Sequence, residues 1–257
     1  MKAIILLAIL AILVAPALAS NSLCNVPRPQ VLNTTFSGDG LATNMSNHSQ
    51  QWFIEADGAN RNISVVNILG TSVRSCQMPT WVGVVTTIDI ETNDTDRAWE
   101  TFYYVNGTGN INVFSNTCVS LANVTLDGRR GGVGLATNSS NSAPTNFYIV
   151  NATALTLERF NGTGSSVSNC TLPAAIGAPS GLAWLRGTSP PLFAVTDSTD
   201  DLYYVMNETC GITATGAFIG DLTAASDITA FNSTLFATSS GGIADAVNLS
   251  FNDTIAP

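Results

Sequence analysis

The sequence predicts an all-β repeat fold, and three observations support that prediction. Runs rich in Val, Ile, Thr, Phe and Tyr alternate with clusters of Gly, Asn, Asp and Ser, as expected of short strands joined by turns. Helical periodicity is weak throughout the chain after residue 20. Three sequence markers recur at intervals of about 47 residues, which indicates several copies of one structural unit.

The first marker is a residue that opens an apolar strand, and its copies are 43, 51, 47 and 46 residues apart: Gly40, Gly83, Gly134, Gly181 and Asp227. The second is an aromatic strand, whose copies are 50, 45, 45 and 43 residues apart: Phe53, Tyr103, Tyr148, Phe193 and Phe236. The third is a single cysteine after a polar turn: Cys76, Cys118, Cys170 and Cys210. The markers agree on a period near 47 residues, and the first two recur five times.

Each unit is predicted to hold four strands. The opening strand and the aromatic strand are followed by a third strand, expected at 63–69, 111–115, 155–160, 202–206 and 246–251, and a fourth strand lies near the cysteine. Four short strands in 40–50 residues are typical of one blade of a β-propeller. The sequence therefore predicts an all-β, five-bladed β-propeller, with blades near 40–82, 83–133, 134–180, 181–226 and 227–257 plus 24–36.

The N-terminal segment is predicted to close the ring. Cys24-Asn-Val-Pro is similar to Cys76-Gln-Met-Pro, and the last unit has no fourth strand of its own. Segment 24–36 should therefore supply that strand, which leaves no open sheet edge. Two alternatives stay open: a larger propeller formed with another chain, and strand addition of 24–36 to a neighbouring subunit.

The blade sequence resembles the repeats of secreted β-propeller proteins. The resemblance lies in Leu-Tyr-Tyr-Val at 202–205 and Thr-Cys-Gly-Ile-Thr at 209–213. Blade number and size are similar to those of the five-bladed tachylectin-type lectins, but the ligand-binding signature of those lectins is not evident. Five-bladed glycosidases and apyrase-like nucleotidases share the architecture, and their catalytic patterns do not recur either. The resemblance implies the fold and no specific function.

The first residues are typical of a secretory signal peptide. Lys2 precedes an apolar run from 4 to 14, and Ala-Leu-Ala at 17–19 fits a cleavage site. We therefore expect residues 1–19 to be removed, residues 20–257 to form a single domain, and the product to be secreted and extracellular or associated with a cell surface. No second long apolar run follows, so no membrane insertion is expected.

Charge excludes one class of partner. The net charge is −9, only 11% of residues are charged, and Lys2 is the one lysine. Nucleic acid is not an expected partner, because its recognition depends on a basic surface. The expected partners are further copies of the chain or other extracellular glycoproteins, and carbohydrate under a lectin hypothesis.

A surface with so few charges needs another source of hydration, and N-glycans would supply it. The acceptor motif Asn-x-Ser/Thr occurs at Asn33, Asn44, Asn47, Asn62, Asn93, Asn106, Asn123, Asn138, Asn151, Asn161, Asn169, Asn207, Asn232, Asn248 and Asn252. Many of these motifs follow the first or third strand of a unit. We therefore expect glycans to load one face of the ring, with Asn169 on that face and Asn123 on or near the other.

No disulfide is expected. The cysteines are odd in number and are predicted to occupy one equivalent site per blade. Equivalent sites near the rim of neighbouring blades are roughly 18–24 Å apart, given strand spacings of about 4.8 Å. A disulfide requires Cα atoms within about 7 Å. Free buried thiols are therefore predicted.

One acidic stretch suggests a calcium loop. Oxygen ligands recur at the first, third, fifth and twelfth positions of 89–100: Asp89, Glu91, Asn93 and Glu100. Glycine is missing from the tight-turn position, so a solvated acidic loop is the alternative. No other cofactor is expected.

Catalytic patterns are scarce. His48 is the only histidine, which argues against a Ser-His-Asp triad and against histidine-based zinc chemistry. Asp39 and Asp227 could face the axis as a carboxylate pair, but the other blades hold no counterpart. The favoured function is a non-enzymatic extracellular structural or adhesion glycoprotein, such as a coat or filament subunit. A lectin-type carbohydrate-binding propeller and a glycosidase-like enzyme are the alternatives.

Overall fold

The structure is a computed structural model, and the all-β prediction is confirmed: the described residues form strands and contain no helix. They are 32–33, 40–43, 52–57, 61–67, 72–81, 85–91, 101–106, 109–115, 117–127, 132–139, 144–185, 188, 190–200, 202–218, 224–231, 234–239 and 243–248. Across these ranges no helix is long and apolar enough to span a membrane. The predicted signal peptide lies outside them.

The described strands form five antiparallel four-stranded sheets. Sheet 1 holds β2 (Gly40–Thr43), β3 (Trp52–Asp57), β4 (Asn62–Asn67) and β5 (Ser72–Gln77). Sheet 2 holds β6 (Val85–Glu91), β7 (Thr101–Asn106), β8 (Asn110–Ser115) and β9 (Ser120–Thr125). Sheet 3 holds β10 (Gly132–Ser139), β11 (Pro144–Asn151), β12 (Thr156–Asn161) and β13 (Ser166–Thr171). Sheet 4 holds β14 (Pro179–Leu185), β15 (Leu192–Asp197), β16 (Leu202–Asn207) and β17 (Ile212–Ala217). Sheet 5 holds β18 (Ala225–Phe231), β19 (Thr234–Ser239), β20 (Ile243–Asn248) and β1 (Leu32–Asn33).

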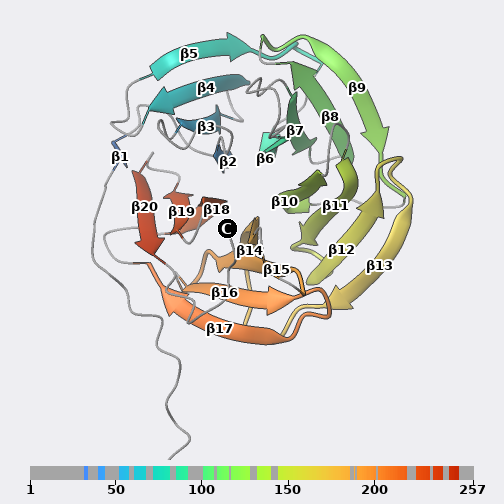
Figure 1. Ribbon diagram of the computed structural model, residues 1–257, viewed down its shortest axis with the longest axis vertical. Coiled ribbons are helices and arrows are strands. Elements are labelled where there is room, and N and C mark those ends of the chain that lie inside the picture. Colours follow the sequence, from blue (N-terminus) through green and yellow to red (C-terminus); the bar gives the residue numbers. More distant parts are fainter. Residues whose placement is uncertain are drawn as a thin grey trace, which may run out of the picture.

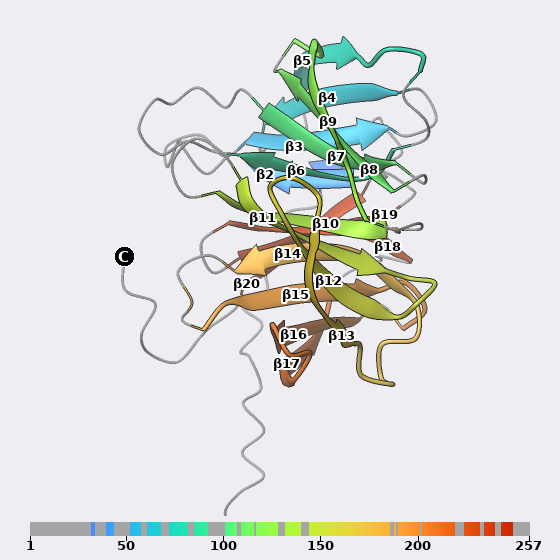
Figure 2. The ribbon, with the colours of Figure 1, turned by 90° about the vertical axis from the view of Figure 1, so that its right-hand side faces the viewer.

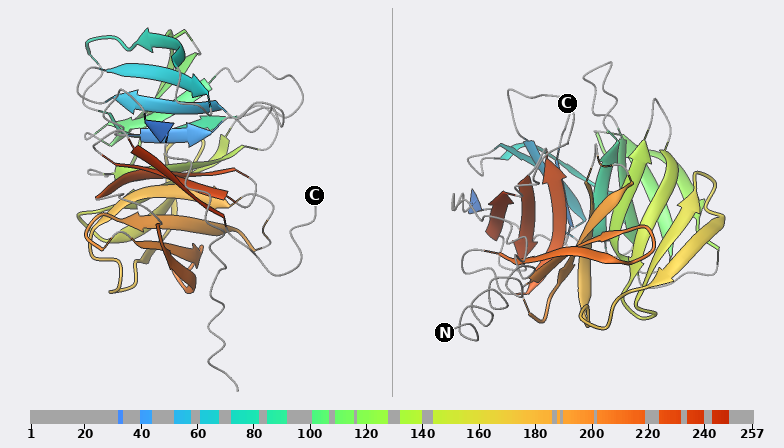
Figure 3. Two further views of the ribbon diagram at one scale, coloured as in Figure 1. Left: turned by 90° about the vertical axis from the view of Figure 1, so that its left-hand side faces the viewer. Right: turned by 60° about the horizontal axis from the view of Figure 1, so that its bottom comes forward.

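The sheets are arranged radially around one centre (Figure 1). The inner strands β2, β6, β10, β14 and β18 surround that centre, and β5, β9, β13 and β17 lie at the rim. The inner strands are seen nearly end-on and the rim strands lengthwise, so each sheet twists strongly from centre to rim, as strand sterics require. The side views show the strands of each sheet crossing the thickness of the ring (Figures 2 and 3).

The fifth sheet takes strands from two distant parts of the sequence. Leu32 pairs with Ala244 and Asn33 pairs with Ile243, so β1 lies on the outer side of β20. Leu32 thus stands opposite the second residue of the third strand of its sheet. Cys76 and Cys170 stand opposite the second residue of the third strand in sheets 1 and 3, so Leu32 and not Cys24 is their equivalent. The predicted alignment of Cys24 with Cys76 and Cys170 is therefore wrong. Cys24 itself lies outside the described residues.

Strand pairing makes the repeat more regular than the sequence markers suggested. The residue that faces the second strand at one fixed register is Gly40, Thr87, Gly134, Gly181 or Asp227, at spacings of 47, 47, 47 and 46. The predicted opening at Gly83 is wrong by four residues. The apolar residues after Gly83 imitate a strand opening, but cross-strand pairing with β7 sets the register.

The third strand of the last unit also differs from the prediction. It is Ile243–Asn248, three residues earlier than the expected 246–251, because only three residues separate it from β19. Asn248 therefore ends a third strand, as Asn161 and Asn207 do in sheets 3 and 4.

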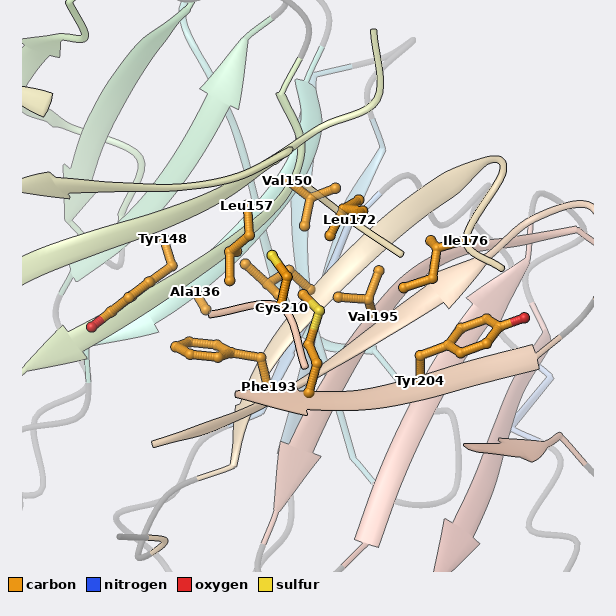
Figure 4. Packing of buried hydrophobic residues seen from close by; sticks show 12 residues of the cluster. Ala136, Tyr148, Val150, Leu157, Leu172, Ile176, Phe193, Val195, Tyr204 and Cys210 are labelled. Carbon is orange, nitrogen blue, oxygen red and sulfur yellow. The ribbon is translucent and has the colours of Figure 1, made fainter. Parts of the chain in front are cut away.

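The hydrophobic core lies between successive sheets. Between sheets 3 and 4, Leu157 and Val150 of one sheet pack against Phe193 and Val195 of the other (Figure 4). Nearer the centre the backbones of neighbouring inner strands approach closely. A Cβ added to Gly134 or Gly181 would overlap backbone atoms of the next inner strand. Glycine is required at these two positions by space rather than by its dihedral freedom.

Candidate functional site: the rim and its turns

The turn between the third and the outer strand, here called the rim turn, has one hydrogen-bond pattern in two sheets. In sheet 3, Asn161 Oδ1 accepts from Thr163 N at 3.0 Å, Thr163 Oγ1 at 2.8 Å and Ser165 N at 3.0 Å. In sheet 4, Asn207 Oδ1 accepts from Thr209 N at 3.1 Å, Thr209 Oγ1 at 2.8 Å and Gly211 N at 2.8 Å. The Asn-x-Thr motif is thus a turn-forming unit in its own right.

Sheet 2 builds the same turn with serine. Ser115 Oγ accepts from Thr117 N at 3.3 Å and from Val119 N at 3.1 Å, and lies 3.0 Å from Thr117 Oγ1. The turn ends on a left-handed residue in each sheet, with φ of 60° at Cys118, 88° at Gly164 and 62° at Cys210. Sheet 2 needs no acceptor motif for this turn, so the turn geometry explains the recurrence of Asn-x-Thr at this place.

Two rim turns are joined covalently to the preceding sheet. Cys76 in β5 forms a disulfide with Cys118, and Cys170 in β13 forms one with Cys210. The Cα–Cα distances are 5.8 Å and 5.9 Å. The prediction of no disulfide is wrong, and so is the prediction of equivalent cysteine sites. Cys76 and Cys170 lie in outer strands, whereas Cys118 and Cys210 end rim turns, and these non-equivalent positions meet across the gap between sheets.

The sequence holds a signal for this pairing that the prediction did not use. Cys76 and Cys170 are each followed by proline three residues later, whereas Cys118 and Cys210 each follow a threonine. The two contexts alternate along the chain and mark two structural positions.

The junction between sheets 2 and 3 uses the same two positions without sulfur. Val124 stands at the outer-strand position and Gly164 at the rim-turn position. Asp127 N donates to Gly164 O at 3.1 Å, and Ser166 N donates to Asp127 Oδ2 at 3.4 Å. A Cβ on Gly164 would overlap Thr125 O, so glycine allows direct contact between the two backbones, where the junctions between sheets 1 and 2 and between sheets 3 and 4 have a disulfide.

A polar network reinforces the junction between sheets 3 and 4. Tyr148 Oη donates to Glu208 Oε1 at 2.6 Å, and Arg159 Nη1 lies 3.7 Å from the same oxygen. Arg159 Nε also donates to Asn146 Oδ1 at 3.0 Å. Burial raises the pKa of the Tyr148 hydroxyl, and the hydrogen bond to Glu208 raises it further, so Tyr148 remains a protonated donor. Glu208 thus ties the rim turn of sheet 4 to sheet 3 beside the disulfide.

Asp227, one member of the carboxylate pair considered above, serves as an acceptor for backbone amides. Asp227 Oδ2 accepts from Leu41 N at 2.9 Å, and Oδ1 accepts from Ile228 N at 2.8 Å. This links the inner strands of sheets 5 and 1. Asp39 lies outside the described residues.

Asp197 is a similar case at the end of β15. Its carboxylate accepts from Gly177 N at 2.7 Å, Ala178 N at 2.9 Å and Thr199 N at 2.8 Å. Burial alone would raise the pKa of Asp197, but the backbone hydrogen bonds outweigh burial and lower it. Asp197 is therefore an ionised structural acceptor.

The predicted glycan acceptors fall into distinct environments. Asn123 in β9 and Asn169 in β13 are exposed, whereas Asn62, Asn161 and Asn207 are half-buried. Asn123 and Asn169 occupy one equivalent position, each opposite the third residue of its neighbouring strand, so the prediction that places them on different faces is wrong.

Asn151 is buried, with 6% of its surface exposed. Its Oδ1 accepts from Thr153 N and Ala154 N, and its Nδ2 donates to Glu158 Oε1 at 3.4 Å. Asn33, Asn106, Asn138 and Asn248 lie in strands, but their side chains are outside the described set. The motifs at Asn44, Asn47, Asn93, Asn232 and Asn252 lie outside the described residues.

The predicted calcium loop is not a loop at its start. Asp89 and Glu91 belong to β6, where they pair with Tyr103 and Thr101. Asn93 and Glu100 lie outside the described residues. Among the residues that are described, no three His, Cys, Asp or Glu side chains come together in a way that could hold a metal ion.

Comparison with known proteins gives the fold class. No family model and no curated protein matches the chain. Among solved structures, the chain is similar to a glutaminyl cyclase from Myxococcus xanthus, with a TM-score of 0.62 and 13% identity over 88% of this chain and 96% of that one.

Two further similar structures have lower scores. BBS1N, solved in complex with ARL6DN, has a TM-score of 0.46 and 13% identity, with 84% of this chain covering 66% of that one. BamB from Moraxella catarrhalis has a TM-score of 0.40 and 15% identity, with 84% of this chain covering 59% of that one. All three are β-propeller-type folds, and the similarity to the glutaminyl cyclase shows that the fold of this chain is of that type.

Proposed function

We propose that the chain is a five-bladed β-propeller closed by its own N-terminal strand, and that it is a secreted, non-enzymatic structural or adhesion glycoprotein. The architecture is supported by the five four-stranded sheets around one centre and by the pairing of β1 with β20. Each sheet then corresponds to one blade. Closure by both chain ends gives the fifth blade its fourth strand and covers the outer side of β20.

The observation that carries the extracellular role is the covalent linkage of the rim. Cys76–Cys118 joins blades 1 and 2, and Cys170–Cys210 joins blades 3 and 4. Disulfides persist in oxidising compartments and are rare where thiols are kept reduced. The two disulfides, together with the predicted signal peptide, favour a secreted scaffold whose fold is stabilised covalently outside the cell.

The buried acids described above support the non-enzymatic part. A catalytic acid or base needs a side chain that can reach a substrate. Asp227 and Asp197 instead accept several backbone hydrogen bonds inside the fold. The activity of the glutaminyl cyclase is not transferred to this chain, because 13% identity supports the fold alone.

The functional test uses protein purified from the medium of a eukaryotic culture expressing the full chain. Beads coated with it should adhere to each other through many weak contacts that act together, although the free protein is monomeric. Reduced, alkylated protein is the control. The same material should hydrolyse no nitrophenyl glycoside and bind no sugar on a glycan array. Array binding that free sugar abolishes would replace the proposal by the lectin function. Glycoside hydrolysis would overturn the non-enzymatic role.

The closure proposal has its own test. Deleting residues 20–36 removes β1 and leaves the outer side of β20 unpaired, so the protein should unfold or polymerise. Deleting residues 20–30 retains β1 and is the matched control, which should stay monomeric in light scattering after size exclusion. Equal thermal stability and a monomeric state for both deletions would refute closure by β1.

A further inference from the structure

The outer strands of blades 2 and 3 lack the usual protection of a sheet edge. Each ends its sheet, so one side of its backbone pairs with no described strand. Such edges invite pairing with another chain, and proteins commonly block them with charged side chains. Neither β9 (Ser-Leu-Ala-Asn-Val-Thr) nor β13 (Ser-Val-Ser-Asn-Cys-Thr) contains a charged residue.

Both strands also expose apolar side chains. Leu121 is 56% exposed in β9, and Val167, which holds the equivalent place in β13, is 51% exposed. An uncharged edge with exposed β-branched or aliphatic residues has the properties of an association site. A bulky, hydrated group attached to these strands would keep such edges apart.

Each edge carries one acceptor motif at the same position. Asn123 starts Asn-Val-Thr and Asn169 starts Asn-Cys-Thr, 46 residues later. Both asparagines are exposed, and so are Thr125 and Thr171, which complete the motifs. Exposed edges are where a bulky, hydrated glycan fits without disturbing the core.

We propose that Asn123 and Asn169 carry N-glycans and that these glycans protect the rim edges of blades 2 and 3 against edge-to-edge association. This inference rests on the proposed secretory route. In this proposal the glycans prevent edge-to-edge pairing, as charged lysine side chains do on the edge strands of other proteins. Asn151 is the counter-example, because its buried amide donates to Glu158 and leaves no room for a glycan.

The test compares two double variants that both remove the acceptors. Asn123→Gln with Asn169→Gln removes the glycans and leaves the edges uncharged, so the secreted protein should shift from monomer to oligomers in light scattering. Asn123→Lys with Asn169→Lys also lacks the glycans but places a charged side chain on each edge, so this variant should remain monomeric. Thermal unfolding of all forms checks that folding is intact.

Site-resolved mass spectrometry of the wild-type protein should find Asn123 and Asn169 occupied and Asn151 empty. A gain-of-site variant, Thr215→Asn with Ala217→Thr, places the motif at the equivalent exposed position of β17 and should add one glycan without loss of folding. Occupied Asn151 in folded protein, or empty Asn123 and Asn169, would overturn the assignment. A monomeric Gln variant, or a folded Lys variant that associates as the Gln variant does, would overturn the guarding role.

Failure of this inference can be told apart from failure of the proposed function. If other motifs carry glycans while Asn123 and Asn169 are empty, only the inference falls. If no motif carries a glycan and the protein stays in the cell, the secretory route falls and the inference falls with it.

Discussion

At the scale of the residue, the rim turn shows how one side chain can satisfy a turn and resemble a modification signal. Asn207 Oδ1 accepts two backbone amides and one hydroxyl, and Ser115 makes the corresponding backbone contacts in sheet 2. Asn-to-Gln, the usual substitution for removing a glycan, would therefore also break the turn, because the longer side chain moves the oxygen away from the amides.

This gives a prediction with its control built into the chain. Asn207→Ser keeps a turn acceptor and Asn207→Gln does not, while both remove the acceptor motif. We expect the melting temperature of Asn207→Gln to fall by about 2–6 °C, as for the loss of a capping side chain, and that of Asn207→Ser to change by about 1 °C or less. Scanning calorimetry measures both. Equal losses would mean that a glycan rather than the turn stabilises this site.

A second residue-scale feature is the pairing of a large with a small residue between blades 4 and 5. Tyr203 is fully buried, packs 5.3 Å from the Phe218 ring centroid, and stands directly opposite Gly216. Ile63 faces Cys76, and Leu157 faces Cys170, at the equivalent places in blades 1 and 3. The Tyr203 ring occupies the space beside Gly216 that a cysteine side chain takes in blades 1 and 3.

Gly216→Ala should therefore be destabilising, because its Cβ would overlap the Tyr203 ring. We expect a loss of about 1–3 kcal/mol in the free energy of unfolding, the range for overpacking a core. Gly177→Ala is the control, since no atom lies within 4 Å of its added Cβ, and it should be neutral within about 0.5 kcal/mol. Urea unfolding distinguishes the two, and equal effects would contradict the packing argument.

At the scale of the element, the junctions between neighbouring sheets have one layout and several chemical solutions. Cys76 and Cys170 are 94 residues apart, and Cys118 and Cys210 are 92 apart, so the disulfides recur every second blade. Gly164 and Val124 occupy the corresponding places between the two bridged pairs. Five sheets cannot be divided into bridged pairs, and among the described residues no disulfide joins sheet 5 to either neighbour.

The two disulfides should contribute similarly to stability. Their sequence separations are 42 and 40, so the entropy of chain closure is nearly the same. Cys76→Ser with Cys118→Ser, and Cys170→Ser with Cys210→Ser, should each lower the free energy of unfolding by about 2–4 kcal/mol. Denaturant unfolding of both variants tests this. A neutral variant would show that the bridge does not form, and non-reducing peptide mapping should then find free thiols in the wild-type protein.

At the scale of the whole molecule, the uneven distribution of bridges predicts where the ring opens first. Blade 5 meets blade 4 through packing around Tyr203 and Ile228, and meets blade 1 through the Asp227–Leu41 hydrogen bond. Local opening is easiest where no covalent link must be carried along.

Amides of β18, β19 and β20 should therefore exchange with deuterium faster than those of β11, β12, β15 and β16. Hydrogen-exchange mass spectrometry under native conditions measures this, and reduction of the disulfides should narrow the difference. Uniform protection around the ring, or earliest exchange in blade 3, would contradict the prediction.

The sequence by itself determined the strands, their grouping in units of four and the period near 47. These features depend on residue patterns within about ten positions, such as alternating apolar residues and the turn chemistry of Asn, Gly and Ser. The secretory signal also rests on a local pattern, and it stays a prediction. The sequence predicted that segment 24–36 supplies the fourth strand of the last unit, and β1 lies within that segment.

Tertiary structure decided which cysteines form disulfides and which acceptor motifs are buried or exposed. It also decided that Thr87, and not Gly83, holds the fixed register position of the inner strand in sheet 2. Cys76 and Cys118 come together because a rim turn lies against the outer strand of the preceding sheet, a contact between segments 42 residues apart. Asn151 and Asn169 share the same motif, yet one is buried and the other is exposed. Local patterns encode turns and strands, but contacts between neighbouring blades depend on how the twisted sheets pack.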